Sequence, residues 1–172
     1  MQTALSNRVG ERASGFTLVE LLIVVIILAI LAAIVVPQFA TSTDDAKEAA
    51  LDSTLANMRD VIDLYFAQHG EYPAALADGA SAANTEAAFI SQLSRYTDGD
   101  GTSSDTKGGV YVYGPYLKLP QVPKEPMTNT RAIVIVSAGS LALIADAANP
   151  GGWKFDSGSG RLIVNHGTWQ DR

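Results

Sequence analysis

The sequence predicts an α+β protein in which one long N-terminal helix precedes a small antiparallel β-sheet domain. Three observations carry this prediction: an almost unbroken apolar run, then a helical stripe of apolar side chains, then short β-branched and aromatic segments separated by turns. The 172 residues suffice for one small domain attached to a helix. We expect four segments: residues 1–15, 16–36, 37–70 and 71–172.

The apolar run at residues 16–36 is long enough to cross a lipid bilayer. As a helix it would extend about 30 Å, which is the thickness of the hydrocarbon core. Its polar residues are Thr17 and Glu20. A carboxylate in such a run is costly to insert, so Glu20 marks a functional site.

The helix is expected to continue beyond Pro37 to about His69. Pro37 removes one backbone hydrogen bond and should bend or loosen the helix locally. Gly70 supplies a stop signal. Five apolar side chains form a stripe in this second half, which predicts packing against a sheet: Leu51, Leu55, Met58, Ile62 and Tyr65.

Residues 71–172 are expected to contain loops, one short helix and four to five strands. A helix at residues 86–93 would have Thr85 as its N-cap. Two hairpins are expected, one pairing residues 132–136 with 141–145 and one pairing residues 153–155 with 161–164. A further strand is expected at residues 110–113. Short turns between successive strands predict an antiparallel sheet.

A calcium site is the one metal centre that the sequence suggests, in the polar loop at residues 98–109. Its candidate ligands are three carboxylates: Asp98, Asp100 and Asp105. Their spacing departs from the EF-hand pattern, so a solvated loop is favoured and no other cofactor is expected. Neither His69 nor His166 lies near a nucleophile motif, so no enzymatic activity is predicted.

Charge and cysteine content narrow the possible functions. The net charge is −6, and removing residues 1–15 with their two Arg and one Glu would make it −7, which argues against nucleic acid as the main partner. The chain contains no cysteine. Arg8 and Arg12 precede the apolar run and the next cation is Lys47, which favours a cytoplasmic N-terminus.

The stretch Gly-Phe-Thr-Leu-Val-Glu at residues 15–20, followed by the apolar run, closely resembles the start of type IV prepilin-like proteins. These are the type IV pilins and the pseudopilins of type II secretion. The resemblance implies a pilin-like fold with residues 1–15 as a leader peptide. It also implies cleavage after Gly15 by a prepilin peptidase, N-methylation of Phe16, and a role for Glu20 in docking subunits. Pro37 stands where this family has a proline at the end of the run.

The resemblance implies a structural filament subunit in the inner membrane, with residues 16–36 forming the filament core after assembly. A pseudopilin for protein export is favoured, and a type IV pilus subunit for adhesion, motility or DNA uptake is the alternative. Its implied partners are other copies of the chain, the prepilin peptidase, an inner-membrane assembly platform and minor pilins. Its C-terminal domain would be periplasmic or extracellular. A monomeric membrane-anchored binding module is a second alternative, and it would be indifferent to loss of Glu20.

Overall fold

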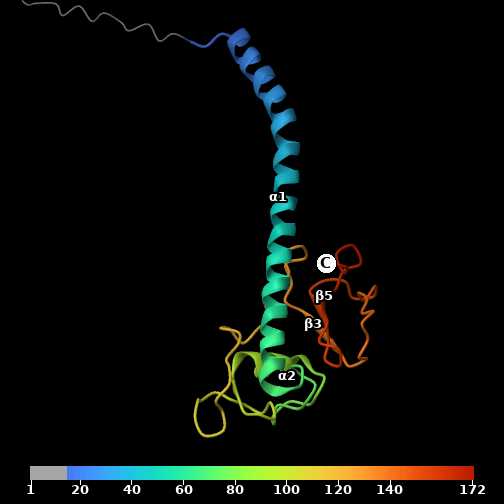
Figure 1. The fold of residues 1–172 in the computed structure, drawn as a ribbon. Coiled ribbons are helices and arrows are strands. Elements are labelled where there is room, and N and C mark those ends of the chain that lie inside the picture. The colour runs from blue at the N-terminus through green and yellow to red at the C-terminus, as the bar shows by residue number, and fades with distance from the viewer. Residues whose placement is uncertain (1–14) are drawn as a thin grey trace, which may run out of the picture. The chain divides into compact units, whose positions relative to one another are not determined.

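A computed structural model describes residues 15–172, and the expected leader at residues 1–15, with its two arginines, lies outside them except for Gly15. The chain divides into two compact units, Met1–Thr43 and Asp44–Arg172. Mixed helix and sheet confirm the α+β class (Figure 1). The elements run in this order: α1 (Leu18–His69), α2 (Glu86–Ser94), β1 (Tyr96–Thr97), β2 (Ser103–Ser104), β3 (Ile133–Val136), β4 (Trp153–Asp156) and β5 (Leu162–Val164).

Helix α1 comprises 52 residues and includes Pro37, so the predicted continuation beyond this proline is confirmed. It ends at His69, where the sequence predicted its end, and Gly70 follows with a φ of 74°. A positive φ suits glycine because it has no Cβ to clash with the backbone. The N-terminal part of α1, Leu18–Val36, has a mean hydropathy of 3.4 and buries none of its residues in the chain itself.

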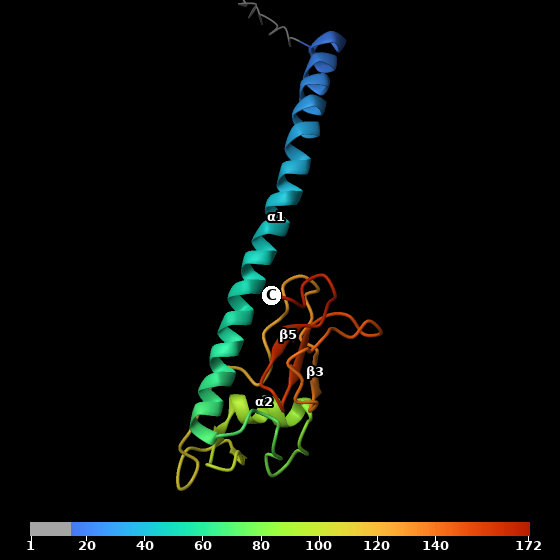
Figure 2. The ribbon, with the colours of Figure 1, turned by 45° about the vertical axis from the view of Figure 1, so that its right-hand side comes forward.

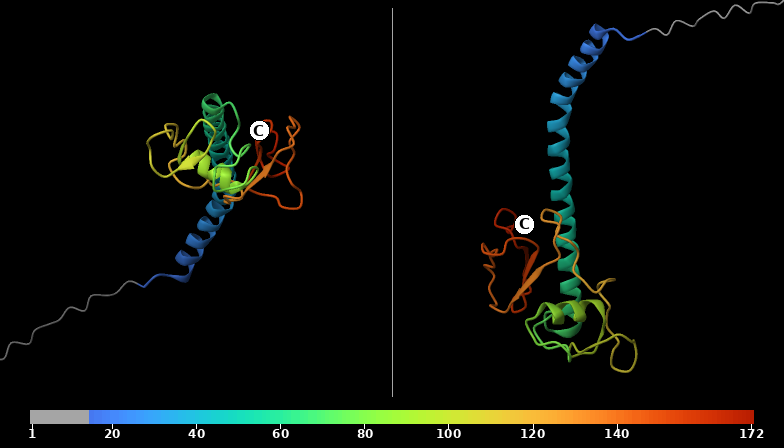
Figure 3. Two further views of the ribbon diagram at one scale, coloured as in Figure 1. Left: turned by 90° about the horizontal axis from the view of Figure 1, so that it is seen from below. Right: turned by 180° about the vertical axis from the view of Figure 1, so that it is seen from behind.

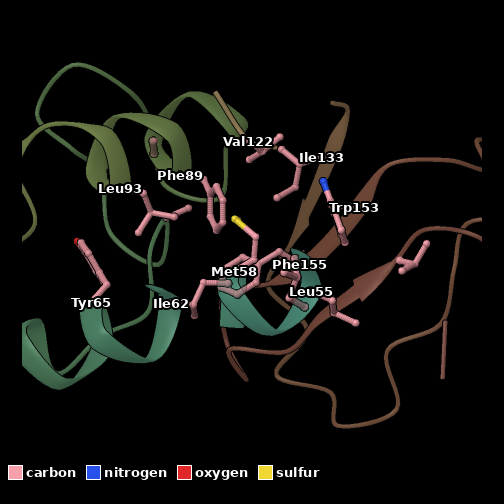
Figure 4. Packing of buried hydrophobic residues seen from close by; sticks show 14 of the residues in the cluster. Leu55, Met58, Ile62, Tyr65, Phe89, Leu93, Val122, Ile133, Trp153 and Phe155 are labelled. Carbon is pink, nitrogen blue, oxygen red and sulfur yellow. The ribbon is translucent and has the colours of Figure 1, made fainter. Parts of the chain in front are cut away.

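In the Asp44–Arg172 unit, the sheet and α2 lie along the C-terminal part of α1 (Figures 2 and 3). The five apolar side chains of the predicted stripe are each at most 2% exposed, which confirms that the stripe is core packing. They meet Phe89 and Leu93 of α2 and the aromatic residues Trp153 and Phe155 of β4 (Figure 4). Burying a side chain of this size stabilises the fold by about 1.5–3 kcal/mol.

The predicted short helix and its cap are also confirmed. The side chain of Thr85 accepts a hydrogen bond of 3.2 Å from the backbone N–H of Ala88, as an N-cap residue does. Helix α2 buries Gln92 together with its apolar face. The Gln92 amide accepts from the N–H of Ala74 at 2.6 Å and donates to the carbonyl of Gly101 at 3.0 Å, so it joins two loops.

The main sheet has the order β3-β4-β5. Strands β4 and β5 form the predicted antiparallel hairpin, with Trp153 opposite Val164. Strand β3 pairs with β4 in parallel, with Ile133 opposite Trp153, so the predicted hairpin between residues 132–136 and 141–145 is wrong. Parallel neighbours need a long connection, which residues 137–152 supply.

A second, two-stranded sheet joins β1 and β2 antiparallel around the loop that begins at Asp98. No local pattern in the sequence predicts this pair of strands. The predicted strand at residues 110–113 is wrong, because its pairing is limited to isolated bridges, of which one joins Tyr113 to Thr97. The backbone N–H groups of Val112 and Tyr113 both donate to the carbonyl of Thr97, at 3.1 Å each, so the chain turns there and does not extend the ladder.

Candidate functional site

The Gly15–Phe16 peptide bond lies just before the first turn of α1. Residues 15–17 are not helical and are exposed, and the Phe16 side chain is 82% exposed. Nothing lies within 4 Å of the place where a Cβ on Gly15 would stand. An exposed, non-helical backbone leaves this peptide bond accessible to a peptidase.

Thr17 and Glu20 form a capping box at the start of α1. The Glu20 carboxylate accepts from the Thr17 backbone N–H at 2.9 Å and from the Thr17 hydroxyl at 2.8 Å. The Glu20 backbone N–H donates to the Thr17 hydroxyl oxygen at 3.2 Å. This reciprocal pair satisfies backbone donors that a helix N-terminus otherwise leaves open.

The capping role of Glu20 was visible in the sequence and was missed. The pattern Thr-x-x-Glu before an apolar run is the signature of a capping box. The sequence interpretation gave Glu20 only a role in assembly. The carboxylate therefore has a local use in the single chain, and any assembly role must be tested separately from it.

The apolar segment that follows is uncovered. The stretch Leu18–Val36 contains no charge other than Glu20, and its large side chains are 41–81% exposed. By length and composition it is able to cross a membrane. A helix that is apolar on every side requires lipid or other apolar helices around it.

Pro37 follows this segment directly and lies within α1. A proline in a helix leaves the carbonyl four residues earlier, here that of Ala33, without its usual N–H partner. A few residues later, the Thr43 hydroxyl donates to the Phe39 carbonyl at 2.8 Å. The helical backbone nevertheless continues through this stretch in the single chain.

The three carboxylates of the candidate calcium loop do not converge. Asp98 accepts from the backbone N–H groups of Asp100 at 3.0 Å and Thr102 at 2.8 Å, which closes the turn between β1 and β2. Asp105 pairs with Arg95 at 2.7 Å. Across residues 15–172, no three His, Cys, Asp or Glu side chains are grouped so as to hold a metal ion.

Three other carboxylates are buried and organise loops: Asp78, Glu125 and Asp156, each at most 2% exposed. Glu125 accepts from the N–H groups of Met127 and Thr128 at 2.6 and 2.7 Å. No sequence pattern identified these residues as buried, because their donors are local turns and distant loops. Such carboxylates replace regular backbone pairing in a loop-rich domain.

Asp156 fixes two loops at once. Its carboxylate accepts from Gly139 at 3.2 Å, Ser140 at 2.7 Å and Gly158 at 3.0 Å, and from the Ser159 hydroxyl at 3.1 Å. Burial by itself raises the pKa of this carboxyl, but these hydrogen bonds to the charged form outweigh it and leave the pKa lowered from 3.8. The pKa of Asp78 is lowered in the same way, by Ser91, Ser81, Ala80 and Ser103 against the effect of burial.

Acid should therefore destabilise the Asp44–Arg172 unit. A carboxyl whose pKa is lower in the folded state stabilises the fold above its unfolded pKa, and this contribution is lost as pH falls through the folded pKa. We expect the free energy of unfolding to be steady between pH 7 and 5 and to fall below about pH 4. Denaturant titrations of the full chain in detergent, followed by tryptophan fluorescence, measure this.

Two variants show whether Asp156 is responsible for the loss of stability in acid. Asp156→Asn should cost about 1–3 kcal/mol at pH 7, because its amide nitrogen faces N–H donors. The loss should shrink as the pH falls below about 4, because the wild type then loses the stabilisation that its own carboxylate supplies. Asp60→Asn, at an exposed position, should change little. An Asp156→Asn loss that is constant with pH would contradict this account.

The two histidines have packing roles in the structure. The His69 ring stacks on Tyr65 with a centroid distance of 3.9 Å, and its Nε2 lies 2.9 Å from the Thr97 hydroxyl, which ties the end of α1 to β1. The His166 ring lies 4.5 Å from that of Trp169. Thr97, whose hydroxyl lies beside the His69 imidazole, is fully buried.

Comparison with known proteins agrees with the N-terminal geometry. The prokaryotic N-terminal methylation motif matches residues 12–36. The chain is 54% identical over 48 residues to the type IV narrow pilus major component PilA5 of Thermus thermophilus, covering 28% of this chain and 41% of that one. It is 41% identical over 63 residues to the type II secretion system core protein G of Pseudomonas aeruginosa, covering 37% and 44%.

The core protein G of Aeromonas hydrophila matches 63 residues at 35% identity, which is 37% of this chain and 44% of that one. The chain therefore spans less than half the length of the curated relatives it matches. No solved structure matches the chain. These similarities cover the same N-terminal part of the chain that holds the exposed junction at Gly15 and the apolar helix. In this segment the chain is similar to the type IV prepilin-like proteins, which include both pilins and type II secretion pseudopilins.

Proposed function

We propose that this chain is a structural subunit of a pilin-like filament and not an enzyme. The observation that carries the proposal is the uncovered apolar helix Leu18–Val36, which begins at a capping box holding its one charge. A plain membrane anchor has no use for a carboxylate, which costs free energy in lipid. In a filament, helices from many copies cover one another and leave the lipid.

Protein export by a type II secretion system is the favoured role. Core protein G relatives match the chain over 63 residues, and the chain has no cysteine for the disulfide-bounded loop found in many adhesive pilins. The higher identity to PilA5 favours the second candidate, a type IV pilus subunit. A monomeric membrane-anchored binding module is the third, and it would form no filament.

The proposal places the chain once through the inner membrane, with the N-terminus in the cytoplasm and the C-terminal domain outside. Its partners are other copies of itself, the prepilin peptidase, an inner-membrane assembly platform and minor pilins. Deleting the gene separates the first two candidates. Loss of exported proteins from the medium supports the pseudopilin, and loss of surface filaments with normal export supports the pilus subunit.

Processing gives a direct test of the proposal. We expect the mature chain to begin with N-methylated Phe16, because Gly15–Phe16 is an exposed, non-helical junction with no side chain at its first residue. Mass analysis of the N-terminal peptide of the native protein measures this. Gly15→Val should leave the precursor uncut, whereas Gly10→Val within the leader should be cut normally. An assembled protein that keeps residues 1–15 would refute the proposed processing.

Pro37 is proposed to let the helix loosen as the subunit leaves the membrane. Pro37 cannot donate a hydrogen bond to the Ala33 carbonyl, and four of the six residues that follow it are weak helix formers (Phe39, Thr41, Ser42 and Thr43), so opening this turn costs little. In the filament, density near residues 37–42 should be extended or irregular, although the single chain is helical there. A high-resolution filament reconstruction decides the matter, and a regular helix through residues 37–42 would contradict the proposal.

A further inference from the structure

A cleft of about 340 Å³ opens between α1 and the segment 117–123 in the Asp44–Arg172 unit. Its walls are mainly apolar, with Met58, Val61, Leu117 and Val122 among them. Lys118 and Arg131 also line it, and no carboxylate does. A concave apolar site with a few polar groups that set orientation is the usual form of a binding site, and this volume lies within the usual range.

Arg131, which lines the cleft, also carries a buried donor that no group in the described residues satisfies. Its Nε is buried and has no hydrogen-bond partner within residues 15–172, and it is alone in this among the buried side-chain nitrogens and oxygens of that range. A buried donor without a partner costs about 1–3 kcal/mol. Two cations and no carboxylate on a mainly apolar lining suit an anionic group that arrives with apolar surface.

The loop at residues 139–146, here called the display loop, exposes apolar side chains and carries a carboxylate, so it complements the apolar and cationic cleft. Leu141 is 77% exposed and Ile144 is 66% exposed, and they are the most exposed large apolar side chains in the Asp44–Arg172 unit. Leu143 between them is only 8% exposed and anchors the loop. Asp146 is the one charged residue of the loop.

The display loop is held rigidly, although it is not a strand. Four side chains from later in the sequence bond to its backbone. The Asp156 carboxylate accepts from the backbone N–H groups of Gly139 and Ser140, and Arg161 donates to the Leu141 carbonyl. The backbone N–H of Ala145 donates to Gln170 and that of Asp146 to Asn165, both at 2.7 Å. Exposed apolar side chains on a fixed loop bind with little loss of conformational entropy. Such a surface is typical of a contact site.

We propose that the cleft of one subunit binds the display loop of a second copy of this chain. Leu141 and Ile144 enter the apolar walls, and the Asp146 carboxylate faces Lys118 and Arg131. The inference rests on the proposed filament function and names one of its contacts. Because the cleft and the loop are different surfaces, the contact is heterologous, and a heterologous contact generates an open helical polymer when its rotation does not close into a ring.

Cysteine cross-linking tests this contact, since the chain has no cysteine of its own. Leu119, on the cleft and 57% exposed, and Leu141 are replaced together in the full chain: Leu119→Cys with Leu141→Cys. Oxidation of assembled filaments should give a ladder of cross-linked chains, because a disulfide forms where Cα atoms come within about 7 Å. Each single variant should remain monomeric on the same gel.

The matched control combines Leu119→Cys with Val112→Cys, which is also exposed but lies in another loop. It should give no ladder. Filaments that form normally and give no ladder with the Leu119–Leu141 pair would overturn the inference while leaving the filament function intact. A ladder of equal strength in the control, or cross-linking of Leu119→Cys to a different protein, would overturn it as well. A wild-type chain that forms no filament contradicts the proposed function itself.

Exchanging the charges of Lys118 and Asp146 tests the same contact without introducing cysteine. Lys118→Glu, at an exposed position, should lower the polymerised fraction several-fold, because two carboxylates then face each other across the contact. Adding Asp146→Lys to the same chain should restore part of it, since the lysine at 146 then pairs with the glutamate at 118, while Arg131 stays unchanged beside them. An unchanged polymerised fraction in Lys118→Glu, or a failure of the exchange to restore a lowered one, would show that these residues do not meet.

Discussion

Replacing Glu20 by leucine is expected to abolish filament formation while membrane insertion and cleavage continue. Leucine removes a charge that costs about 2.5–3.5 kcal/mol at the centre of a membrane helix and less near its end, so insertion should not suffer. Cleavage after Gly15 would create a positive amine at Phe16, four residues before Glu20. In a filament, each of these charges needs the other, because an unpaired buried charge is strongly destabilising.

The capping box requires that this effect be separated from helix capping. Glu20→Gln keeps the capping box, because glutamine also serves at this position, but it removes the charge. Thr17→Ala keeps the carboxylate and removes the hydroxyl that bonds it, at a cost of about 0.5–2 kcal/mol to the helix start. If charge pairing drives assembly, Glu20→Gln should fail as Glu20→Leu does, and Thr17→Ala should still assemble.

The measurements are membrane fractionation for insertion, N-terminal mass for cleavage, and electron microscopy of sheared filaments for assembly. The opposite pattern, with Glu20→Gln assembling and Thr17→Ala failing, would show that capping is the important role. Normal assembly of Glu20→Leu would contradict the pairing of Glu20 with the Phe16 amine and would favour a plain membrane anchor. Each variant thus discriminates between two physical roles for one carboxylate.

The helices were predictable because their signals are local. The stripe from Leu51 to Tyr65 follows the helical period, and all of it is buried. Thr85 precedes a short apolar pattern and caps α2 as predicted. The hairpin of β4 and β5 was also local, since the turn between Asp156 and Gly160 is rich in glycine and serine.

The predicted hairpin between residues 132–136 and 141–145 is wrong because contacts distant in the sequence decide the structure there. Residues 141–145 are apolar enough for a strand, but their backbone N–H groups bond to distant side chains and not to β3. Gln170 takes the N–H of Ala145, and Asn165 takes that of Asp146. These partners lie 19–25 residues away, so no local pattern contains them. β3 instead pairs with β4, because the Ile133 side of that strand completes the core.

The functional and buried polar residues also divide into those with a local sequence signal and those without one. The junction at Gly15 and the carboxylate at Glu20 could be proposed from the sequence because they belong to a contiguous motif. The buried carboxylates at Asp78, Glu125 and Asp156 were not found, because a carboxylate is normally exposed and these are satisfied by loops that fold around them.

Replacing Phe155 by alanine is expected to lower the free energy of unfolding of the Asp44–Arg172 unit by about 3–5 kcal/mol. Phe155 is fully buried, and its ring lies 4.9 Å from that of Phe89, so the change leaves a cavity and removes an aromatic contact between the sheet and α2. Domains of this kind are stable by only about 5–15 kcal/mol in total. The variant should therefore be partly unfolded or aggregated at growth temperature.

Tryptophan fluorescence measures the effect in the full chain, because both tryptophans, Trp153 and Trp169, lie in the Asp44–Arg172 unit. Phe155→Leu should lose less, since leucine refills part of the cavity. Val112→Ala, at a half-exposed position, should stay within about 0.5 kcal/mol of wild type. If Phe155→Ala were as stable as Val112→Ala, the contact between β4 and α2 would not hold this domain together. Membrane insertion should be unchanged in all three variants, because none of them alters the stretch Leu18–Val36.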